Sequence, residues 1–255
     1  MKKGRPGNLW RKLRRAPLAL QIGIALGICI AIWLAANALV QLARKPSEIF
    51  SPVSGALDKL PAETWRSYEP IFRAHATATI TPDFLAALAQ VEGAGNPVAR
   101  TPWRWRLTED PFDVYRPASS AVGMFQITNG TYQQAKRYCI HHNEVAADGP
   151  WYDWKSCWFN WLYVRVVPSH AAEMTAAFLD ISVSRTLRQL KREDATLREK
   201  QDLAAIMHLC GVAAGEDFAK RHFRLSPNQR CGGQNVGAYL GQLRALQRTF
   251  AALER

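Results

Sequence analysis

The sequence predicts a mainly α-helical domain that follows a single N-terminal transmembrane helix. Residues 16–43 carry no charged side chain, and the run from Leu18 to Leu42 is almost wholly apolar. After residue 63, apolar residues recur at spacings of three and four, as between Leu179 and Leu190, which is typical of amphipathic helices. No alternating run is long enough for a large sheet, and no internal repeat is present.

The apolar run is long enough to cross a bilayer as a helix. Seven positive residues precede it, so the basic tail at 1–16 is expected to stay in the cytoplasm. We therefore expect a single-pass inner-membrane anchor at 17–42, a linker at 43–62 and a periplasmic domain at 63–255. A cleaved signal peptide is the alternative, because Ala36-Asn37-Ala38 has the small-x-small form of a cleavage site.

The net charge of +12 does not indicate a nucleic-acid-binding protein. Nine basic residues and no acid lie in residues 1–45, which leaves an excess of only three positive charges over the rest of the chain. A phosphate backbone is bound by a denser basic surface. We therefore expect no nucleic acid among the partners.

The cysteines agree with an oxidising compartment. Cys29 lies in the apolar run, and an even set follows it: Cys139, Cys157, Cys210 and Cys231. Pairing of sequence neighbours, Cys139–Cys157 and Cys210–Cys231, is the simplest of three connectivities. Metal binding is the rival interpretation, but there is no CxxC, and His141 and His142 are adjacent rather than spaced along one helix face. We expect neither a metal nor another cofactor.

The helices expected in the exported part cover residues 64–74, 82–92, 131–138, 154–166, 169–188, 197–209, 215–222 and 236–253. Trp151, Trp154, Trp158 and Trp161 have 3-4-3 spacing, which favours a core stripe on one helix. Residues 98–120 form a long irregular insertion with interleaved arginines and tryptophans. The insertion either binds a sugar polymer through its aromatic and guanidinium groups or is a loop pinned by its tryptophans.

Glu92 closes the helix expected at 82–92. Thr81 suits the N-cap and Pro82 the first turn, whereas the segment 93–97 (Gly-Ala-Gly-Asn-Pro) cannot continue a helix. The negative end of the helix dipole and an apolar face both raise the pKa of a carboxyl, which suits a general acid. A solvent-exposed glutamate at a helix end is the alternative.

Downstream, residues 119–128 form a small-residue turn followed by an apolar segment with one amide, Gln126. Such a turn lets a ligand approach the backbone closely. Gln126 could instead satisfy buried backbone groups. Glu173, near Ser169, has a capping-box-like position and is interpreted as structural.

Taken in order, these residues resemble the lytic transglycosylases of the SLT, or goose-lysozyme-like, group. The pattern of that group is a Glu, then Asn-Pro, a hydroxyl residue and a Gly-x-x-Gly-Leu-Met-Gln-Ile turn. Glu92, Asn96-Pro97, Thr101 and the segment 120–127 stand in those places. The resemblance covers roughly residues 80–250 and implies a lysozyme-like fold for the domain at 63–255.

The sequence departs from the pattern at several positions. Ser120 replaces the first glycine of the turn, and Thr101 replaces the usual serine. An Ala-Tyr-Asn-Ala-Gly element resembles residues 207–211 and places His208 at the tyrosine. A Glu-x-x-x-Tyr element resembles residues 235–239, with Asn235 in place of the acid. By resemblance, the substrate-binding residues are Thr101, Ser120, Gln126, His208 and Tyr239, although His208 and Tyr239 could also be packing residues.

The resemblance implies that the chain cleaves the β-1,4 bond between MurNAc and GlcNAc in peptidoglycan strands and forms a 1,6-anhydro sugar. Glu92 would act as acid and then as base, with no second carboxylate. Glu109, Asp110 and Asp113 lie in the insertion. The alternatives are a hydrolytic muramidase on the same fold and a degenerate peptidoglycan-binding or envelope-assembly protein. Envelope machinery is a further expected partner.

Overall fold

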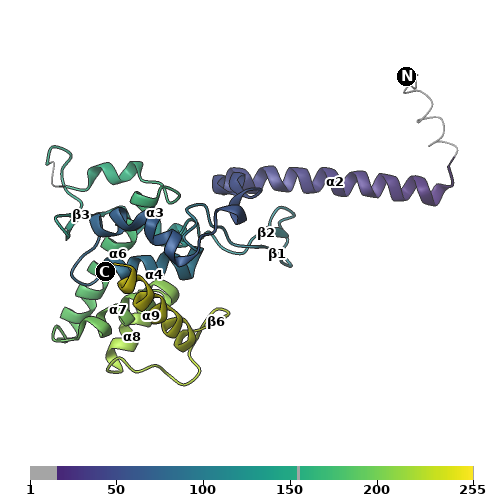
Figure 1. Cartoon of the computed structure of the whole chain (residues 1–255). Helices are drawn as coiled ribbons and strands as arrows, with labels where there is room; N and C mark the ends of the chain where they lie inside the picture. Colours follow the sequence, from purple (N-terminus) through teal and green to yellow (C-terminus); the bar gives the residue numbers. More distant parts are fainter. Residues whose placement is uncertain (1–15, 154–155, 255) are drawn as a thin grey trace. The chain divides into compact units, whose positions relative to one another are not determined.

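The computed structural model describes residues 16–153 and 156–254 (Figure 1). The basic tail expected at 1–16 lies outside these ranges except for Ala16. The described chain is mainly helical, as predicted. Its α-helices are α2 (Leu18–Arg44), α3 (Pro61–Ala74), α4 (Pro82–Gly93), α5 (Asn129–Ala135), α6 (Pro168–Gln189), α7 (Leu197–Cys210), α8 (Val212–Lys220) and α9 (Val236–Leu253).

The remaining elements are short. The 3₁₀ helices are η1 (Pro46–Phe50), η2 (Ser54–Leu57) and η3 (Trp158–Leu162). The strands form three antiparallel pairs: β1 (Trp103–Trp105) with β2 (Tyr115–Pro117), β3 (Tyr138–His141) with β4 (Glu144–Ala147), and β5 (Arg230–Cys231) with β6 (Gln234–Asn235). The expectation of no large sheet is confirmed for the described residues.

The chain forms two compact units. The first contains α2 and the segment 103–117, and the second contains residues 49–102 and 118–254. The insertion at 98–120 is not wholly irregular. It contains the strands β1 and β2, which pair with Trp105 opposite Tyr115. In the linker expected at 43–62, α2 continues to Arg44, and η1 and η2 follow it.

In the first unit, α2 is 27 residues long and has no charged residue before Arg44. Among the described residues it is the one helix long and apolar enough to cross a membrane. Most of its aliphatic side chains are exposed, whereas Asn37 and Gln41 are buried. This pattern is the reverse of a helix in a soluble core.

In the second unit, α4 forms the centre of the core. Every side chain from Phe84 to Ala89 is fully buried, so this stretch of α4 is apolar on all sides, as in a helix surrounded by other elements. It packs against α3 and against α9, which is drawn in yellow in Figure 1. The packing of α6 against α7, and of α7 against α8, completes the core. The carboxyl end of α4 thus has a rigid support.

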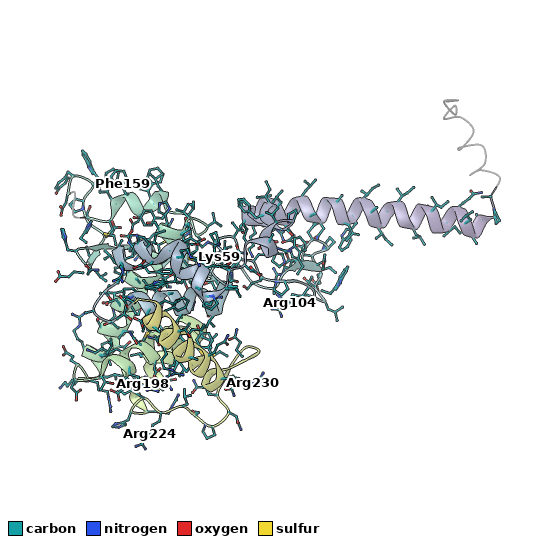
Figure 2. All side chains as sticks on the ribbon, viewed as in Figure 1. Lys59, Arg104, Phe159, Arg198, Arg224 and Arg230 are labelled. Carbon is teal, nitrogen blue, oxygen red and sulfur yellow. A yellow bond between two sulfur atoms is a disulfide. The ribbon has the colours of Figure 1, made fainter. Side chains whose placement is uncertain are left out.

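The prediction of a helix at 154–166 is wrong for the residues of this range that the structure describes. Residues 158–162 form η3, and the exposed fractions of Trp151 and Trp161 are 76% and 65%, so the tryptophans do not form a core stripe. Figure 2 shows Phe159 at the surface of this segment. Asn160 donates from its side chain to Tyr138 O at 2.6 Å, so β3, rather than a helical turn, anchors the segment. Residues 154 and 155 lie outside the described residues.

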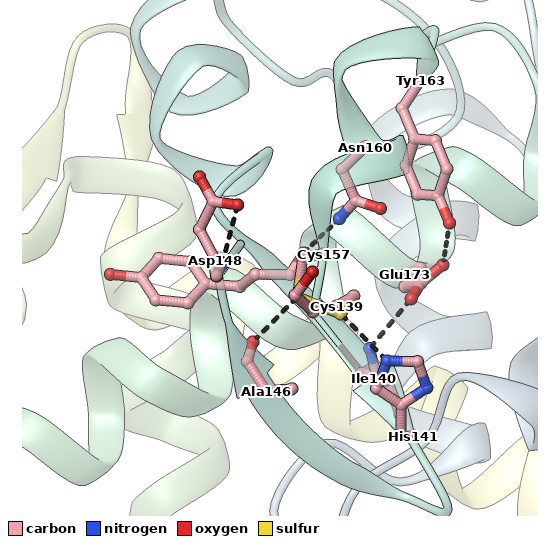
Figure 3. The surroundings of a disulfide bond; sticks show 12 residues. Cys139, Ile140, His141, Ala146, Asp148, Cys157, Asn160, Tyr163 and Glu173 are labelled. Carbon is pink, nitrogen blue, oxygen red and sulfur yellow. Dashed lines mark hydrogen bonds between the residues drawn. A yellow bond between two sulfur atoms is a disulfide. The ribbon is translucent and has the colours of Figure 1, made fainter. Parts of the chain in front are cut away.

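Both expected disulfides, Cys139–Cys157 and Cys210–Cys231, are present, which confirms the pairing of sequence neighbours. The first joins β3 to the segment before η3, as Figure 3 shows. The helix expected at 131–138 runs from Asn129 to Ala135 instead. Tyr138, where the helix was expected to end, is the first residue of β3.

Glu173 does not form a capping box with Ser169. Its carboxylate is buried and accepts hydrogen bonds from Ile140 N at 2.8 Å and from Tyr163 Oη at 2.6 Å (Figure 3). Burial and the charge of Glu173 raise the pKa of Tyr163, so its hydroxyl remains a donor. Glu173 therefore holds β3 and the segment after η3 against α6, which is a structural role.

Candidate functional site

Glu92 lies in the last turn of α4, as predicted. The helix ends because Ala94 adopts a left-handed conformation with φ of 49°, and its amide donates to Gln90 O. Only 12% of the Glu92 side chain is exposed, so the solvent-exposed alternative is wrong. Thr81 precedes α4 but makes no capping bond through its side chain; its hydroxyl accepts from Gln201 Nε2 at 3.0 Å.

Two other helices bring polar side chains to Glu92. The hydroxyl of Tyr239, in the first turns of α9, donates to Glu92 Oε1 over 2.6 Å. His208, near the end of α7, places its Nε2 3.9 Å from the same oxygen. The structure thus brings together three residues that the sequence resemblance placed in one site.

The surroundings of Tyr239 explain its protonation state. Burial raises its pKa well above the ordinary value, and the negative charge of Glu92 adds to this effect. The hydroxyl therefore stays protonated and acts as a donor to Glu92. Asn235, which replaces the acid of the family pattern, is the N-cap of α9: its Oδ1 accepts from Ala238 N at 2.9 Å.

The small-residue turn lies directly against the end of α4. A Cβ atom on Gly93 would stand 2.8 Å from Met124 Cα, so the two backbones touch beside Glu92. Gly123 has φ of +80°, and a Cβ there would stand 2.3 Å from Arg165 O. Glycine is required at both positions, because a side chain would push the turn away from Glu92 or from Arg165.

Of the other predicted substrate-binding residues, Ser120 and Gln126 lie in this turn and Thr101 is bonded to it, and all three make backbone contacts. Gln126 donates through Nε2 to Ala99 O at 3.1 Å and to Gly123 O at 2.9 Å. The hydroxyl of Ser120 accepts from Asn129 N at 3.1 Å, and that of Thr101 donates to Ser119 O at 3.2 Å. These bonds shape the turn, and a role in substrate binding remains a prediction for all three residues.

Asn96 also has a structural role beside the site. It is buried, and its Nδ2 donates to Asp58 Oδ1 at 2.8 Å while its Oδ1 accepts from Val98 N at 2.9 Å. Asn96 thereby fixes the loop after Glu92 to the residues that follow η2.

The sequence analysis did not identify Arg165, which supports the turn from behind. Its Nη1 donates to Ser120 O at 2.9 Å and to Ile127 O at 2.7 Å, and its guanidinium lies 5.1 Å from the centre of the Tyr132 ring. Burial lowers the pKa of this guanidinium. The available sequence signal is an isolated charge within the apolar stretch from Leu162 to Pro168.

A narrow crevice begins at His208. Its volume is about 10 Å³, close to the space that one water needs. Its walls include Thr131, Thr175, Phe178 and His208. Thr175 Oγ1 is buried and has no hydrogen-bond partner among the described residues. A buried hydroxyl without a partner is costly, so the crevice offers an unused polar contact to a ligand or a water.

A larger hollow shares one lining residue, Phe178, with the crevice. This hollow has a volume of about 320 Å³, and Arg137, Arg185 and Glu216 are among the residues that line it. Arg185 Nη2 lies 3.2 Å from Tyr138 Oη. With two guanidinium groups against one carboxylate, the hollow suits an anionic group. In the described part of the chain, no group of three or more His, Cys, Asp or Glu side chains is placed to hold a metal ion.

Comparisons with protein-family models, curated proteins and solved structures found no match to this chain.

Proposed function

We propose that this chain is a membrane-anchored peptidoglycan lytic transglycosylase that cleaves the MurNAc–GlcNAc β-1,4 bond and forms 1,6-anhydroMurNAc. The observation that carries the proposal is the convergence of Tyr239 and His208 on the largely buried Glu92. The small-residue turn at 119–128 also touches the backbone of Gly93, the residue after Glu92. A lysozyme-like arrangement of the helical unit is part of the proposal.

The proposed reaction needs one carboxyl group that acts twice. Glu92 protonates the glycosidic oxygen as the bond from C1 of MurNAc to that oxygen breaks. The C6 hydroxyl of the same sugar then bonds to C1 and transfers its proton to Glu92, which restores the acid. No water and no second carboxylate take part, because the nucleophile belongs to the substrate. This scheme fits the polar contacts of Glu92, which are the phenol of Tyr239 and the imidazole of His208. Of the acids in the insertion, Asp110 and Asp113 form ion pairs with Arg44.

Tyr239 and His208 have distinct roles in this scheme. Tyr239 holds the carboxyl group in position and stabilises the negative charge that Glu92 carries after the first proton transfer. His208 lies between Glu92 and the crevice that includes Thr175, so we assign it to contact with the sugar next to the scissile bond.

The helix α2 supports a membrane location for this reaction. Its length and composition suit a single-pass anchor, and the positive residues before it favour a cytoplasmic N-terminus. We therefore place the helical unit in the periplasm, with α2 in the inner membrane. The disulfides Cys139–Cys157 and Cys210–Cys231 agree with an oxidising compartment. Glycan strands are the proposed substrate, and envelope machinery is a proposed partner.

Digestion of purified sacculi by the detergent-solubilised full chain tests the proposal. Wild-type protein should release muropeptides that end in 1,6-anhydroMurNAc, identified by mass. Glu92→Gln keeps the shape of the side chain and should lower the rate by about 10²- to 10⁴-fold, since it removes the general acid. Products heavier by one water would identify a hydrolytic muramidase. If the folded wild-type protein binds sacculi without cleaving them, the proposed activity is excluded and the peptidoglycan-binding alternative is favoured.

A further inference from the structure

The β1–β2 hairpin belongs to the same compact unit as α2 and packs on the last turns of that helix. Asn37 Nδ2 donates to Tyr115 O at 2.7 Å, and Gln41 Nε2 donates to Phe112 O. Arg44 forms ion pairs with Asp113 at 2.6 Å and with Asp110 at 3.4 Å. The hairpin thus follows α2 over about two helical turns.

Asn37 and Gln41 of α2 are buried by these contacts, whereas no apolar residue of the helix is buried. Asn37 and Gln41 are 1% and 4% exposed, while Ile32 and Leu39 are 64% and 69% exposed. Side-chain amides without partners are costly in hydrocarbon, and the two carbonyl groups of the hairpin supply the missing acceptors. This division suits a helix in lipid that carries the hairpin at one end.

The depth of the contact follows from helix geometry. At about 1.5 Å per residue, Asn37 stands about 28 Å along the axis from Leu18, close to the roughly 30 Å thickness of the hydrocarbon layer. When Leu18 lies at one edge of that layer, Asn37 lies at the other edge. Gln41 and Arg44 then reach the headgroups, together with the hairpin that binds them.

The hairpin carries side chains typical of that depth. Trp105 is 64% exposed, and Leu107 is fully exposed. The Trp105 ring stacks with Tyr115, at 4.6 Å between ring centres, and with Trp33 of α2, at 6.2 Å. Tryptophan and tyrosine are enriched at membrane–water interfaces. Arg104, labelled in Figure 2, is exposed beside them, and arginine can place its stem along lipid while its head stays in water.

We propose that the hairpin at 103–117 lies in the membrane–water interface at the exit end of α2, with Trp105 and Leu107 in contact with lipid. The partner is the bilayer surface itself. This inference requires α2 to cross a bilayer, and it does not depend on the proposed catalytic activity. The competing interpretation is that the same residues bind glycan strands, which would keep them in water.

The test uses spin-labelled full-length protein in vesicles of phosphatidylcholine and phosphatidylglycerol at 3:1, with power saturation by oxygen and by a water-soluble nickel chelate. Cys29 is unpaired and lies in α2, so its label in the wild type reports whether the helix is inserted. Leu107→Cys and the matched control Leu197→Cys, on the exposed start of α7, are each made in a Cys29→Ser background. Neither position is buried, so folding should be preserved.

The label at position 107 should favour oxygen over the chelate by several-fold more than the label at 197, with a depth at the boundary between headgroups and acyl chains. Equal accessibility at 107 and 197 would overturn the proposal in favour of a surface in water. A label at 107 that neither reagent reaches would overturn it in favour of a protein contact. A label at Cys29 that is not deep in the bilayer would overturn the premise.

Discussion

The hydroxyl of Tyr239 lies 2.6 Å from Glu92 Oε1, although 147 residues separate the two in the chain. Tyr239 is 3% exposed and sits among core residues of α9, so its ring packs while its hydroxyl reaches the site. One side chain thereby links the position of α9 to the orientation of the proposed catalytic carboxyl.

Tyr239→Phe should lower the rate of muropeptide release while the fold is kept. The phenyl ring preserves packing, but the hydrogen bond to a charged group is lost. Such a bond contributes about 1.5–3 kcal/mol, which corresponds to roughly 10- to 150-fold in rate if it is made fully in the transition state. Turnover on sacculi and thermal unfolding should be measured together. An unchanged turnover at wild-type stability would mean that Tyr239 only packs.

Thr175→Val tests the crevice beside His208. The hydroxyl of Thr175 has no partner among the described residues, so its replacement by a methyl group of similar size should leave stability unchanged or raise it by about 1 kcal/mol. If a sugar uses that hydroxyl, KM for glycan strands should rise severalfold in the same variant. Loss of stability together with unchanged KM would show that the hydroxyl has a structural partner instead.

Arg137→Ala/Arg185→Ala tests the hollow that Arg137, Arg185 and Glu216 line. Peptide stems carry carboxylates, and two guanidinium groups line this hollow. The double variant should bind sacculi about tenfold more weakly, and the loss should shrink on strands stripped of peptides by an amidase. Arg198→Ala/Arg224→Ala removes the same charge from two exposed arginines, labelled in Figure 2, that do not line this hollow. Equal losses in the two variants would indicate a non-specific charge effect.

The helical elements were predictable where apolar periodicity and end signals agreed. The expected range of α9, 236–253, is confirmed at both ends, and α4 extends by one residue to Gly93. The segment at 154–166 had the spacing of a helix, but a disulfide and a contact between Asn160 and Tyr138 draw its described residues to β3. Such constraints come from distant residues and leave no local periodic signal.

The site was only partly predictable for the same reason. The position of Glu92 at a helix end follows from local residues, whereas the approach of His208 and Tyr239 was expected from the family resemblance alone. Arg165 acts through carbonyl groups 38 and 45 residues away, which no local pattern encodes. The pairing of residues 103–117 with α2 depends on two amides in a helix that otherwise looks uniformly apolar.

Gly123→Ala should destabilise the turn beside Glu92. The left-handed conformation alone costs an alanine about 1–2 kcal/mol, and the contact with Arg165 O adds to this cost. We expect a loss of about 2 kcal/mol or more in the free energy of unfolding, together with reduced activity. Gly130→Ala is the matched control, because a Cβ there meets nothing within 4 Å and the residue lies in α5. Equal effects of the two substitutions would contradict the role of the turn.

Stability should fall as the pH decreases from about 7.5 to 5, partly through His75. Burial lowers the pKa of His75, and this effect outweighs the opposing attraction of Glu173, whose Oε2 lies 3.7 Å from His75 Nδ1. The folded state therefore binds fewer protons than the unfolded state, whose histidine pKa is about 6.5. The stabilisation is complete above that value and is lost as the pH falls through it.

His75→Gln should flatten this decline, because glutamine stays neutral and can still bond to the hydroxyl of Ser169, which lies 2.8 Å from His75 Nε2. Thermal unfolding of the detergent-solubilised chain at several pH values measures the slope. If His75→Gln keeps the wild-type slope, protonation of His75 does not control the pH dependence, and the partly buried His170, whose pKa is also lowered by burial, becomes the group to replace next.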